Sequence, residues 1–321
     1  MKTVRVGNIT LASNLVQGPL AGYSCAPFRA LTTRFGQPGF CTTEMISAKD
    51  LVHRRTPLKR YTWRDPTEGL LSYQLSGNDP DDLGRASAIV SELGADIIDL
   101  NAGCPVNKIR SKGCGSSLLA NPEQLYTLVK AIKNNTGACV SIKIRVEGNQ
   151  HDHNDAAVAD AIQQGGADFV TVHGRHWTEN YEAPCRIESI AAIKKHLQIP
   201  VFANGDVCDG ASLERLLTQS GCDGVMIARA SVGQPWLFQQ LRAELSHNPY
   251  SPPSIEEVGT IFWEHIEGLI ALENEKIALL EARKFAKYYA RHLPQAAEFI
   301  SEMLSLTGRD RVAECIKHYF Q

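Results

Sequence analysis

The sequence lacks the features that would place a protein in a membrane or outside the cell. No stretch approaches the roughly 18 consecutive apolar residues of a membrane-spanning helix, and polar residues interrupt the start, MKTVRVGNITLASN. We therefore expect neither a signal peptide nor a membrane anchor. The nine cysteines are an odd number, and no two of them have the Cys-x-x-Cys spacing of a zinc or redox site. The simplest expectation is a reducing cytoplasm and no bound metal.

The sequence also lacks a clear excess of positive charge. Its 33 lysine and arginine residues are balanced by 35 acidic residues, which gives a formal net charge of -2. A nucleic-acid-binding domain is more often clearly basic. Any contact with RNA must therefore use local patches on a nearly neutral protein. With 43% hydrophobic and 21% charged residues, the composition is otherwise that of an ordinary globular protein.

Short apolar runs alternate with amphipathic segments up to about residue 230. The runs cover residues 14–20, 39–44, 70–75, 96–101, 139–145, 168–174, 199–205 and 223–229. The helix-like segments cover residues 26–35, 47–54, 80–93, 122–134, 153–164, 187–196 and 209–219, with one more after Ser231. This alternation indicates a parallel sheet covered by helices. Eight such units fit a TIM (β/α)8 barrel, although an open doubly wound sheet has the same alternation.

The residues at the ends of the runs favour the barrel. Nearly every run ends on its C-terminal side in polar residues or glycine, which in a barrel converge on the face that carries the chemistry. These residues include Gln74, Asn101, Lys143, His173, Asn204 and Arg229. An open sheet would spread them along one edge. The predicted fold class is therefore α/β, with a TIM (β/α)8 barrel.

After about residue 245 the pattern changes to helices alone. The turn-rich segment HNPYSPPS at 247–254 is followed by two long helical patterns and a shorter pair. We predict a barrel domain over residues 1–245 and a C-terminal helical domain over residues 246–321.

The segment NAGCPVNKIRSKGCGSSLL at 101–119 is the most unusual part of the sequence. Cys104 stands three residues past a predicted strand end, and a loop rich in Gly, Ser and Lys follows it. A thiol there is suited to act as a nucleophile or, when protonated, as a general acid. The alternative is a small packing residue in a turn. Cys114 is a weaker candidate because it lies further from the strand end.

Two strands carry basic residues at their ends. Lys143 and Arg145 alternate along one strand and point to the same side, where a lysine inside a barrel needs an electron-rich ligand such as a flavin. The alternative is a lysine that reaches solvent at the strand end. His173 and Arg175 are similarly placed on the next strand, where His173 is either a donor to a flavin carbonyl or a core histidine.

The last two strand ends, ANGD at 203–206 and IARA at 227–230, stand where barrels bind phosphate groups. Small residues let backbone N–H groups approach an anion, and Arg229 adds positive charge. Because glycine is common at strand ends for reasons of turn geometry alone, the prediction depends on the presence of both segments.

Two basic clusters are candidates for contact with a phosphate backbone. In the helical part, Arg283, Lys287 and Arg291 recur every four residues, with Lys284 beside them. Like charges at this spacing weaken a helix slightly, and a merely solvated helix face is the alternative explanation. The second cluster follows the second predicted strand and consists of Arg54, Arg55, Lys59 and Arg60.

In their order along the chain, these motifs resemble those of the tRNA-dihydrouridine synthases. The matching segments are GPLAG (18–22), PFR (27–29), TEM (43–45), QLSG (74–77), DLNAGCP (99–105), GSSLL (115–119), IKIR (142–145), VHGR (172–175), ANGD (203–206) and MIARA (226–230). The resemblance continues through ARKFAKYY in the helical part and is greatest to the bacterial B-type members. It implies an FMN-dependent enzyme that uses NADPH and reduces selected uridines of tRNA to 5,6-dihydrouridine.

The resemblance also implies roles for individual residues. Residues expected to hold FMN are Pro19, Leu20, Ala21, Gln74, Lys143, His173, Asn204, Gly205, Asp206, Ala228 and Arg229. Residues expected to bind tRNA are Asn101 on the target base, Arg145, Arg175, Arg283, Lys284, Lys287 and Arg291. A hydride would pass from flavin N5 to C6 of the uracil, and Cys104 would protonate C5 as the general acid.

Two positions depart from the family pattern. Leu20 stands where methionine is usual, and a leucine keeps the apolar contact with the ring. Ala228 stands where glycine is usual, and its methyl group would crowd the phosphate if the backbone there needed a glycine conformation.

Two other functions remain open from the sequence. One is an FMN-dependent barrel oxidoreductase that acts on a free pyrimidine or another small molecule, and the other is a tRNA-binding protein that has lost catalysis. Retention of Cys104 and Lys143 argues against the second, since binding alone needs neither. No segment of the sequence marks an obligate dimer surface, so we expect a monomer.

Overall fold

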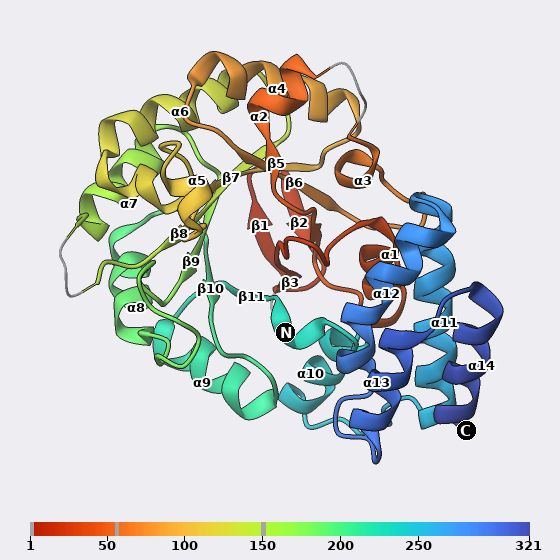
Figure 1. Ribbon diagram of the computed structural model, residues 1–321. Helices are drawn as coiled ribbons and strands as arrows, with labels where there is room; N and C mark the ends of the chain where they lie inside the picture. Colours follow the sequence, from red (N-terminus) through yellow and green to blue (C-terminus); the bar gives the residue numbers. More distant parts are fainter. Residues whose placement is uncertain (1–2, 55–57, 149–151) are drawn as a thin grey trace.

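The computed structural model describes residues 3–54, 58–148 and 152–321, and Figure 1 shows a barrel of strands inside a ring of helices. In these residues the main sheet has nine strands, β3 (Leu15–Gln17), β4 (Cys41–Thr42), β5 (Ile46–Ser47), β6 (Leu71–Ser76), β7 (Ile97–Ala102), β8 (Cys139–Arg145), β9 (Phe169–His173), β10 (Val201–Asn204) and β11 (Gly224–Ile227). The hydrogen-bonded order is β3-β11-β10-β9-β8-β7-β6-β4, and β5 pairs with β6 off this path. Each of these pairings is parallel. The predicted eight-stranded barrel is confirmed.

Backbone hydrogen bonds close the barrel between β3 and the residues just before β4. The N–H of Gln17 donates to the carbonyl of Phe40 at 3.0 Å. The N–H of Gly39 donates to the carbonyl of Leu15 at 2.8 Å. Glycine permits this approach, because a Cβ on Gly39 would lie 2.1 Å from the carbonyl oxygen of Ser13. Closure distinguishes the barrel from an open doubly wound sheet, in which two edges stay unpaired.

Longer helices cover the outside of the barrel, and shorter helices lie in the connecting loops (Figure 1). They are α1 (Ala26–Gly36), α2 (Ala48–His53), α3 (Lys59–Thr62), α4 (Pro80–Glu92), α5 (Asn107–Arg110), α6 (Pro122–Asn134), α7 (Asp155–Gln164), α8 (Ile187–His196), α9 (Gly210–Ser220) and α10 (Leu237–Leu245), with two 3-10 helices, η1 (Gly115–Ala120) and η2 (Arg229–Ser231). Predicted helix starts are confirmed for α4 and α6, where the side chains of Asp79 and Asn121 accept a backbone hydrogen bond from the first turn.

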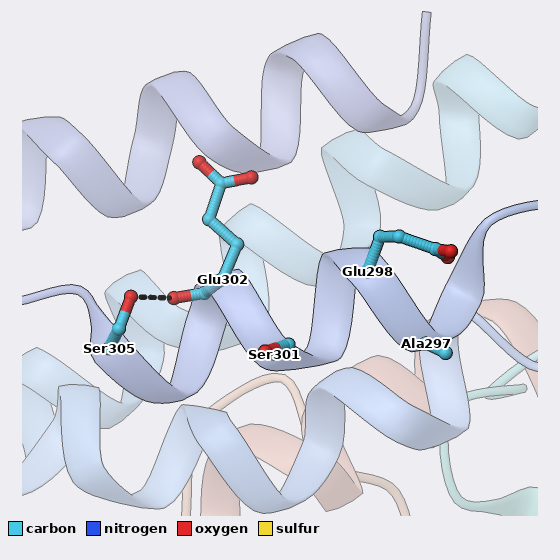
Figure 2. A pocket seen from close by; sticks show the side chains of 5 residues that line it. All are labelled: Ala297, Glu298, Ser301, Glu302 and Ser305. Carbon is cyan, nitrogen blue, oxygen red and sulfur yellow. Dashed lines mark hydrogen bonds between the residues drawn. The ribbon is translucent and has the colours of Figure 1, made fainter.

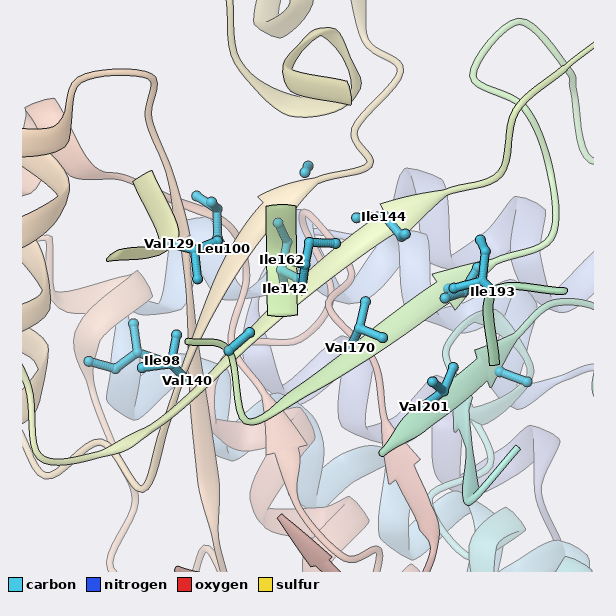
Figure 3. Packing of buried hydrophobic residues seen from close by; sticks show 14 of the residues in the cluster. Ile98, Leu100, Val129, Val140, Ile142, Ile144, Ile162, Val170, Ile193 and Val201 are labelled. Carbon is cyan, nitrogen blue, oxygen red and sulfur yellow. The ribbon is translucent and has the colours of Figure 1, made fainter. Parts of the chain in front are cut away.

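Outward-pointing side chains of the strands form the largest hydrophobic core against the helices. Figure 3 shows Ile142 and Ile144 of β8 and Val170 of β9 together with Ile162 of α7 and Ile193 of α8. All five are at most 2% exposed. Because successive side chains of a strand point to opposite faces, the residues between them point into the lumen of the barrel. Burial of the aliphatic face therefore aims the polar residues of β6, β7, β8 and β9 inward.

Residues 4–11 form an element that the sequence analysis did not predict. Strands β1 (Val4–Val6) and β2 (Ile9–Leu11) pair as an antiparallel hairpin outside the main sheet. Val6 and Leu11 pack with Phe169 and Phe202 in a separate core cluster. Since Phe169 begins β9, the hairpin covers the N-terminal end of the barrel, away from the predicted site.

Four helices follow the barrel, and the first of them packs against α1 (Figure 1). They are α11 (Ile255–Leu272), α12 (Glu275–Tyr289), α13 (Ala296–Ser305) and α14 (Arg309–Tyr319). Their apolar faces join Phe28 and Leu31 of α1 and the side chain of Trp236 in one continuous buried cluster. The helical C-terminal part is confirmed, while the division into domains at residues 245 and 246 stays a prediction. In the described residues, no helix combines the length and the apolar character that crossing a membrane requires.

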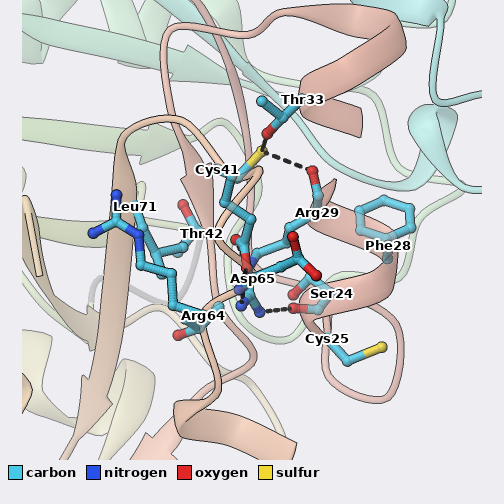
Figure 4. Close-up of polar contacts among 12 residues, drawn as sticks. Ser24, Cys25, Phe28, Arg29, Thr33, Cys41, Thr42, Arg64, Asp65 and Leu71 are labelled. Atoms are coloured by element: carbon cyan, nitrogen blue, oxygen red, sulfur yellow. Dashed lines mark hydrogen bonds and ion pairs between the residues drawn. The ribbon is translucent and has the colours of Figure 1, made fainter. Parts of the chain in front are cut away.

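A buried ion pair joins α1 to the segment before β6. Arg29 donates to the carboxylate of Glu68 through Nε at 2.6 Å and through Nη2 at 3.0 Å. It also donates to the backbone carbonyl of Ser24 at 2.7 Å. Figure 4 shows Arg29 in this cluster, with the thiol of Cys41 against the hydroxyl of Thr33 beside it. All of these contacts are internal, so Arg29 of the PFR motif serves the fold.

Candidate active site at the mouth of the barrel

Polar side chains from neighbouring strands meet at the C-terminal end of the barrel. The parallel register places Asn101 of β7 beside Lys143 of β8, and Arg145 of β8 beside His173 of β9. His173 is in turn beside Asn204 of β10. The structure thus brings together five residues that the sequence analysis selected. Their roles in binding stay predictions.

A chain of hydrogen bonds runs through the lumen to the Cys104 loop. The hydroxyl of Ser141 donates to Asp99 at 2.6 Å, and the amide of Gln74 donates to the other oxygen of Asp99 at 2.8 Å. The amide of Asn101 donates to the side-chain oxygen of Gln74 at 2.8 Å. The side-chain oxygen of Asn101 accepts from the N–H of Cys104 at 3.0 Å. Since ionised Asp99 can only accept, it sets the orientation of both amides.

Asp99 and Ser141 also belong to this site, although they were not predicted from the sequence. Burial raises the pKa of Asp99 to about 6, although hydrogen bonds from Ser141 and Gln74 act in the opposite direction. A signal was present in the sequence. Asp99 stands two residues before Asn101 and Ser141 two before Lys143, so the alternation along each strand puts both on the inward face.

Cys104 is half-buried at the end of β7, and the following loop folds back over its backbone. The N–H and the hydroxyl of Ser116 both donate to the carbonyl of Cys104 at 3.0 Å. Gly115 has φ +63°, and a Cβ there would lie 2.7 Å from the same carbonyl oxygen. Glycine and serine in this loop therefore hold Cys104 in place. Cys114 directs its thiol to the carbonyl of Lys112 at 3.7 Å.

Lys143 lies in the lumen, where it donates to the amide oxygen of Asn204 at 2.9 Å. Burial, and then the nearby charge of Arg145, lowers the pKa of Lys143 to about 7. Beside it on β9, the buried hydroxyl of Thr171 has no hydrogen-bond partner within the described residues. A weakly compensated cation and an unpaired hydroxyl fit a ligand with a polar, electron-rich edge. A flavin has such an edge, so these residues are compatible with FMN.

His173 is 6% exposed at the mouth. Burial lowers its pKa, and the positive charges of Lys143 and Arg145 lower it further. The imidazole is therefore neutral at pH 7 and carries one N–H donor and one acceptor. The expected contact with a flavin carbonyl needs such a donor.

Two arginines expected to bind tRNA are held by groups of the protein itself. Arg145 donates to the carbonyl of Gly103 at 2.7 Å and to that of His176 at 3.1 Å. Arg175 donates to two carbonyl groups and to the carboxylate of Asp206 at 2.6 Å. Arg175 is only 1% exposed, and its Nη1 has no hydrogen-bond partner among the described residues. Their binding to tRNA stays a prediction. Arg145 ends β8 and Arg175 follows β9, so both lie at the mouth of the barrel.

The expected phosphate site lies at the ends of β10 and β11, which pair in parallel. Asp206 has φ +52°, and its carboxylate binds Arg175 and lies 3.7 Å from Arg229. Arg229 is exposed, with its guanidinium 3.6 Å from the ring centroid of Tyr181. Ala228 has φ −120°, so its backbone is not in the left-handed region that favours glycine. Arg229 therefore remains accessible to an anion, and Gly205 lies in the loop after β10, next to Asp206 in the chain.

The first motif forms the loop after β3. Pro19 and Leu20 are half-buried and Ala21 is exposed. The next N–H, that of Gly22, donates to the carboxylate of Glu44 at 2.6 Å. Glu44 is only 3% exposed, so this loop is anchored from inside the protein.

The basic ridge on α12 consists of Arg283, Lys284, Lys287 and Arg291, and these four residues have different surroundings. Arg283 and Arg291 each donate to a backbone carbonyl, at 3.0 and 2.7 Å respectively. Lys284 forms an ion pair with Glu281 of the same helix. Of the four ridge residues, Lys287 is exposed, and the other three are half-buried. It is therefore the ridge residue most available to a phosphate.

Two residues of the second basic cluster, Arg54 and Arg60, form ion pairs. Arg54 pairs with Asp50 at 3.0 Å, while Lys59 lies 5.6 Å from the ring centroid of Trp63. Arg55 lies outside the described residues. Arg60 joins the barrel to the helical part through three carboxylates, Glu44 at 3.1 Å, Glu273 at 3.3 Å and Glu281 at 3.0 Å.

A shallow hollow of about 620 Å³ lies along α13, away from the barrel mouth. Figure 2 shows its lining residues, Ala297, Glu298, Ser301, Glu302 and Ser305. Two carboxylates and no cation line it, so it repels phosphate groups. The barrel mouth remains the better candidate for a nucleotide site.

Solved structures share the barrel. An old yellow enzyme homologue from Zymomonas mobilis aligns with a TM-score of 0.55 and 13% identity, over 80% of this chain and 95% of that one. Morphinone reductase in complex with tetrahydroNAD aligns with a TM-score of 0.56 and 12% identity, over 79% of this chain and 92% of that one. At such low identity, these likenesses support the fold alone.

Sequence comparisons identify the family in addition to the fold. The family model described as dihydrouridine synthase matches residues 15–321. The tRNA-dihydrouridine synthase B of Pseudomonas aeruginosa is 33% identical over 323 residues, which is 100% of this chain and 96% of that one. The probable tRNA-dihydrouridine synthase 1 of Synechocystis is 33% identical over 324 residues, which is 98% of this chain and 90% of that one. The resemblance seen in the motifs is thereby confirmed, and the chain belongs to the dihydrouridine synthase family of oxidoreductases.

Proposed function

We propose that this dihydrouridine synthase acts on tRNA, with FMN as its bound cofactor and NADPH as the source of electrons. The observation that carries the proposal is the convergence of Asn101, Cys104 and Lys143 at one end of the barrel in a chain of this family. The names of the relatives, which include tRNA, support the choice of substrate. We propose further that the enzyme acts as a monomer.

The inward residues have the chemistry to hold FMN. Gln74, Lys143 and His173 would face the ring, where protonated Lys143 stabilises negative charge at its edge. Gly205 and Arg229 would bind the phosphate. When bound, reduced FMN supplies the hydride that adds to C6 of the uracil.

The substrate side of the reaction depends on Cys104 and Asn101. Addition of a hydride at C6 leaves negative charge that a proton at C5 must neutralise, and the Cys104 thiol is the proposed proton donor. Asn101 is oriented by Gln74, so its amide can position the base beside the thiol. To reach this end of the barrel, the uridine must leave the tRNA fold.

The test compares two cysteine variants on tRNA that lacks the modification. Cys104→Ala should keep the yellow flavin spectrum and lose dihydrouridine formation by about 100-fold or more, the usual contribution of a general acid. Cys114→Ala, the matched control in the same loop, should keep both. Full activity in Cys104→Ala would show that another group donates the proton.

The same assay distinguishes the other functions. Reduction of free uridine as efficiently as tRNA would favour a small-molecule oxidoreductase. Purified protein without flavin and without NADPH oxidation would favour a tRNA-binding protein that has lost catalysis. Sequencing of dihydrouridine positions in cells with and without this protein would identify the modified uridines.

A further inference from the structure

Two loops at the barrel mouth meet through a cluster of side chains that the proposed reaction does not use. Asp152 and His153 follow β8, and His176 follows β9. One donor atom from each residue lies within 4.8 Å of the other two. The two histidines come from different loops, so their approach is a feature of the tertiary structure.

The donor atoms have nearly the spacing of metal ligands. Oδ1 of Asp152 lies 2.8 Å from Nε2 of His176 and 3.0 Å from Nδ1 of His153. Around a tetrahedral ion with bonds of about 2.0–2.1 Å, neighbouring donors are about 3.3 Å apart. The two contacts of Oδ1 are thus a few tenths of an ångström shorter than this spacing, and the two histidine nitrogens lie within 4.8 Å of each other.

The outer nitrogens of both histidines face oxygen atoms. Nδ1 of His176 lies 2.8 Å from the hydroxyl of Thr178, whereas Nε2 of His153 lies 3.3 Å from Oδ1 of Asp155 without a hydrogen bond between them. In metal-bound histidines the outer N–H donates to an oxygen and leaves the inner nitrogen free as a ligand. The hydroxyl of Thr178 can accept from His176 in this way, and the N–H of Thr178 also approaches the same Nδ1 at 3.4 Å. The remaining oxygen of Asp152 accepts from the indole of Trp177.

Burial favours a defined site with one open side. The side chains of both histidines are 1% exposed, whereas that of Asp152 is 31% exposed. Two imidazoles and one carboxylate suit zinc and similar divalent transition ions, while magnesium and calcium prefer sites made of oxygen alone. We propose that Asp152, His153 and His176 form a binding site for a divalent transition-metal ion of the zinc class.

A metal ion at this site would stabilise the loops on the substrate side of the mouth. The carbonyl of His176 accepts from Arg145 at 3.1 Å, and the guanidinium of Arg110 lies 3.3 Å from a ring centroid of Trp177. An ion bound here would tie together the loops after β8 and β9, on which this contact of Arg145 depends. It would touch neither Cys104 nor the expected flavin residues, so it is a positioning site rather than part of the reaction.

Calorimetric titration of the full flavin-loaded chain with zinc tests the proposal. After treatment with a chelator, wild-type protein should bind one zinc ion per chain. Asp152→Asn preserves the shape of the side chain and should weaken binding by about 100-fold or more, since even the loss of an outer partner costs 10–100-fold. Thr178→Val, which removes only such an outer partner, should weaken binding by about tenfold.

Controls separate this site from other zinc ligands. His196 and Asp160 form an exposed pair at 2.7 Å on the outside of the barrel, so His196→Ala should bind zinc as the wild type does. X-ray absorption at the zinc edge should show nitrogen and oxygen near 2.0–2.2 Å and no sulfur near 2.3 Å. Circular dichroism and flavin content would establish that each variant is folded. Equal affinity in wild type and Asp152→Asn, sulfur coordination, or no stoichiometric binding would overturn the proposal.

Discussion

Positive charges in the barrel lumen and positive charges at the junction with the helical part face different partners. In the lumen, Lys143 donates to the neutral amide of Asn204. At the junction, Arg60 lies among the carboxylates of Glu44, Glu273 and Glu281. The lumen thus keeps a positive charge available to a ligand, whereas the junction uses its charge to join segments of the chain.

The junction is nevertheless linked to the expected flavin loop. Glu44 binds Arg60 through one oxygen and accepts the N–H of Gly22 through the other. Gly22 directly follows Ala21 of the first motif. The position of α12, which carries Glu281 and the ridge, is therefore coupled to a loop expected to contact FMN.

The largest loss of stability is expected when the counter-charge of the most deeply buried cation is removed. Glu68→Gln would leave Arg29 without its counter-charge and should reduce the free energy of unfolding by about 3–5 kcal/mol, measured by urea denaturation. Glu264→Gln makes the same change in the exposed Arg34–Glu264 pair and should cost less than about 1 kcal/mol. Equal losses in the two variants would contradict the distinction between buried and exposed pairs.

A smaller effect is expected at the junction itself. Arg60→Met would leave the buried carboxylate of Glu44 without its cation and should cost about 2 kcal/mol in urea denaturation. The matched control is Arg309→Met, which breaks an exposed pair with Glu267 and should cost about 0.5 kcal/mol or less. Fluorescence titration should also show weaker FMN binding in Arg60→Met. Unchanged FMN affinity would contradict the coupling through Gly22.

The lowered pKa of Lys143 in the lumen predicts how the stability of the protein changes with pH. In flavin-free protein the pKa of Lys143 is lowered to about 7, whereas in the unfolded chain it is about 10.4. Between these values the unfolded chain binds more protons, so the contribution of Lys143 makes stability rise with pH, by at most about 1.4 kcal/mol per pH unit. Urea denaturation from pH 7 to 9 should show this rise in the wild type relative to Lys143→Met. Parallel profiles would contradict an uncompensated lysine in the lumen.

The smallest effect is expected on the ridge. Lys287→Glu should weaken tRNA binding several-fold and lower the slope of log affinity against log salt by about one, as expected for one phosphate contact. Lys317→Glu makes the same charge change at an exposed position of α14 and serves as the control. Because Arg283 binds a backbone carbonyl, its replacement would disturb the fold and is less informative. Equal tRNA affinity in Lys287→Glu and wild type would remove the ridge from the interface.

Much of the barrel is predictable because strands buried on both faces are nearly continuous apolar runs. The run at 139–145 coincides with β8, and the helical pattern at 187–196 coincides with α8. The hairpin of β1 and β2 escaped prediction because each strand has three residues and alternates with polar ones. Elements this short contain too few side chains to show a period.

The site was partly predictable for a similar reason. Lys143 and Asn101 are unusual at the ends of apolar strands, which makes them visible in the sequence. Strand alternation places Asp99 on the inward face, but its role depends on Gln74 and Ser141, which lie 25 and 42 positions away, so no local pattern identifies these partners. The ridge on α12 is regular in sequence, yet its arginines are held by carbonyl groups of other segments.

By itself, the sequence determined the alternation of strands and helices, the inward polar residues of the strands from β6 to β9 and the position of Cys104 after β7, because these follow from local periodicity. Only the tertiary structure decided which charges are compensated. Arg60 and Glu281 are 221 positions apart, while Lys143 has an amide as its partner. Electrostatic compensation depends on distance in space and on burial, and neither is a property of a local segment.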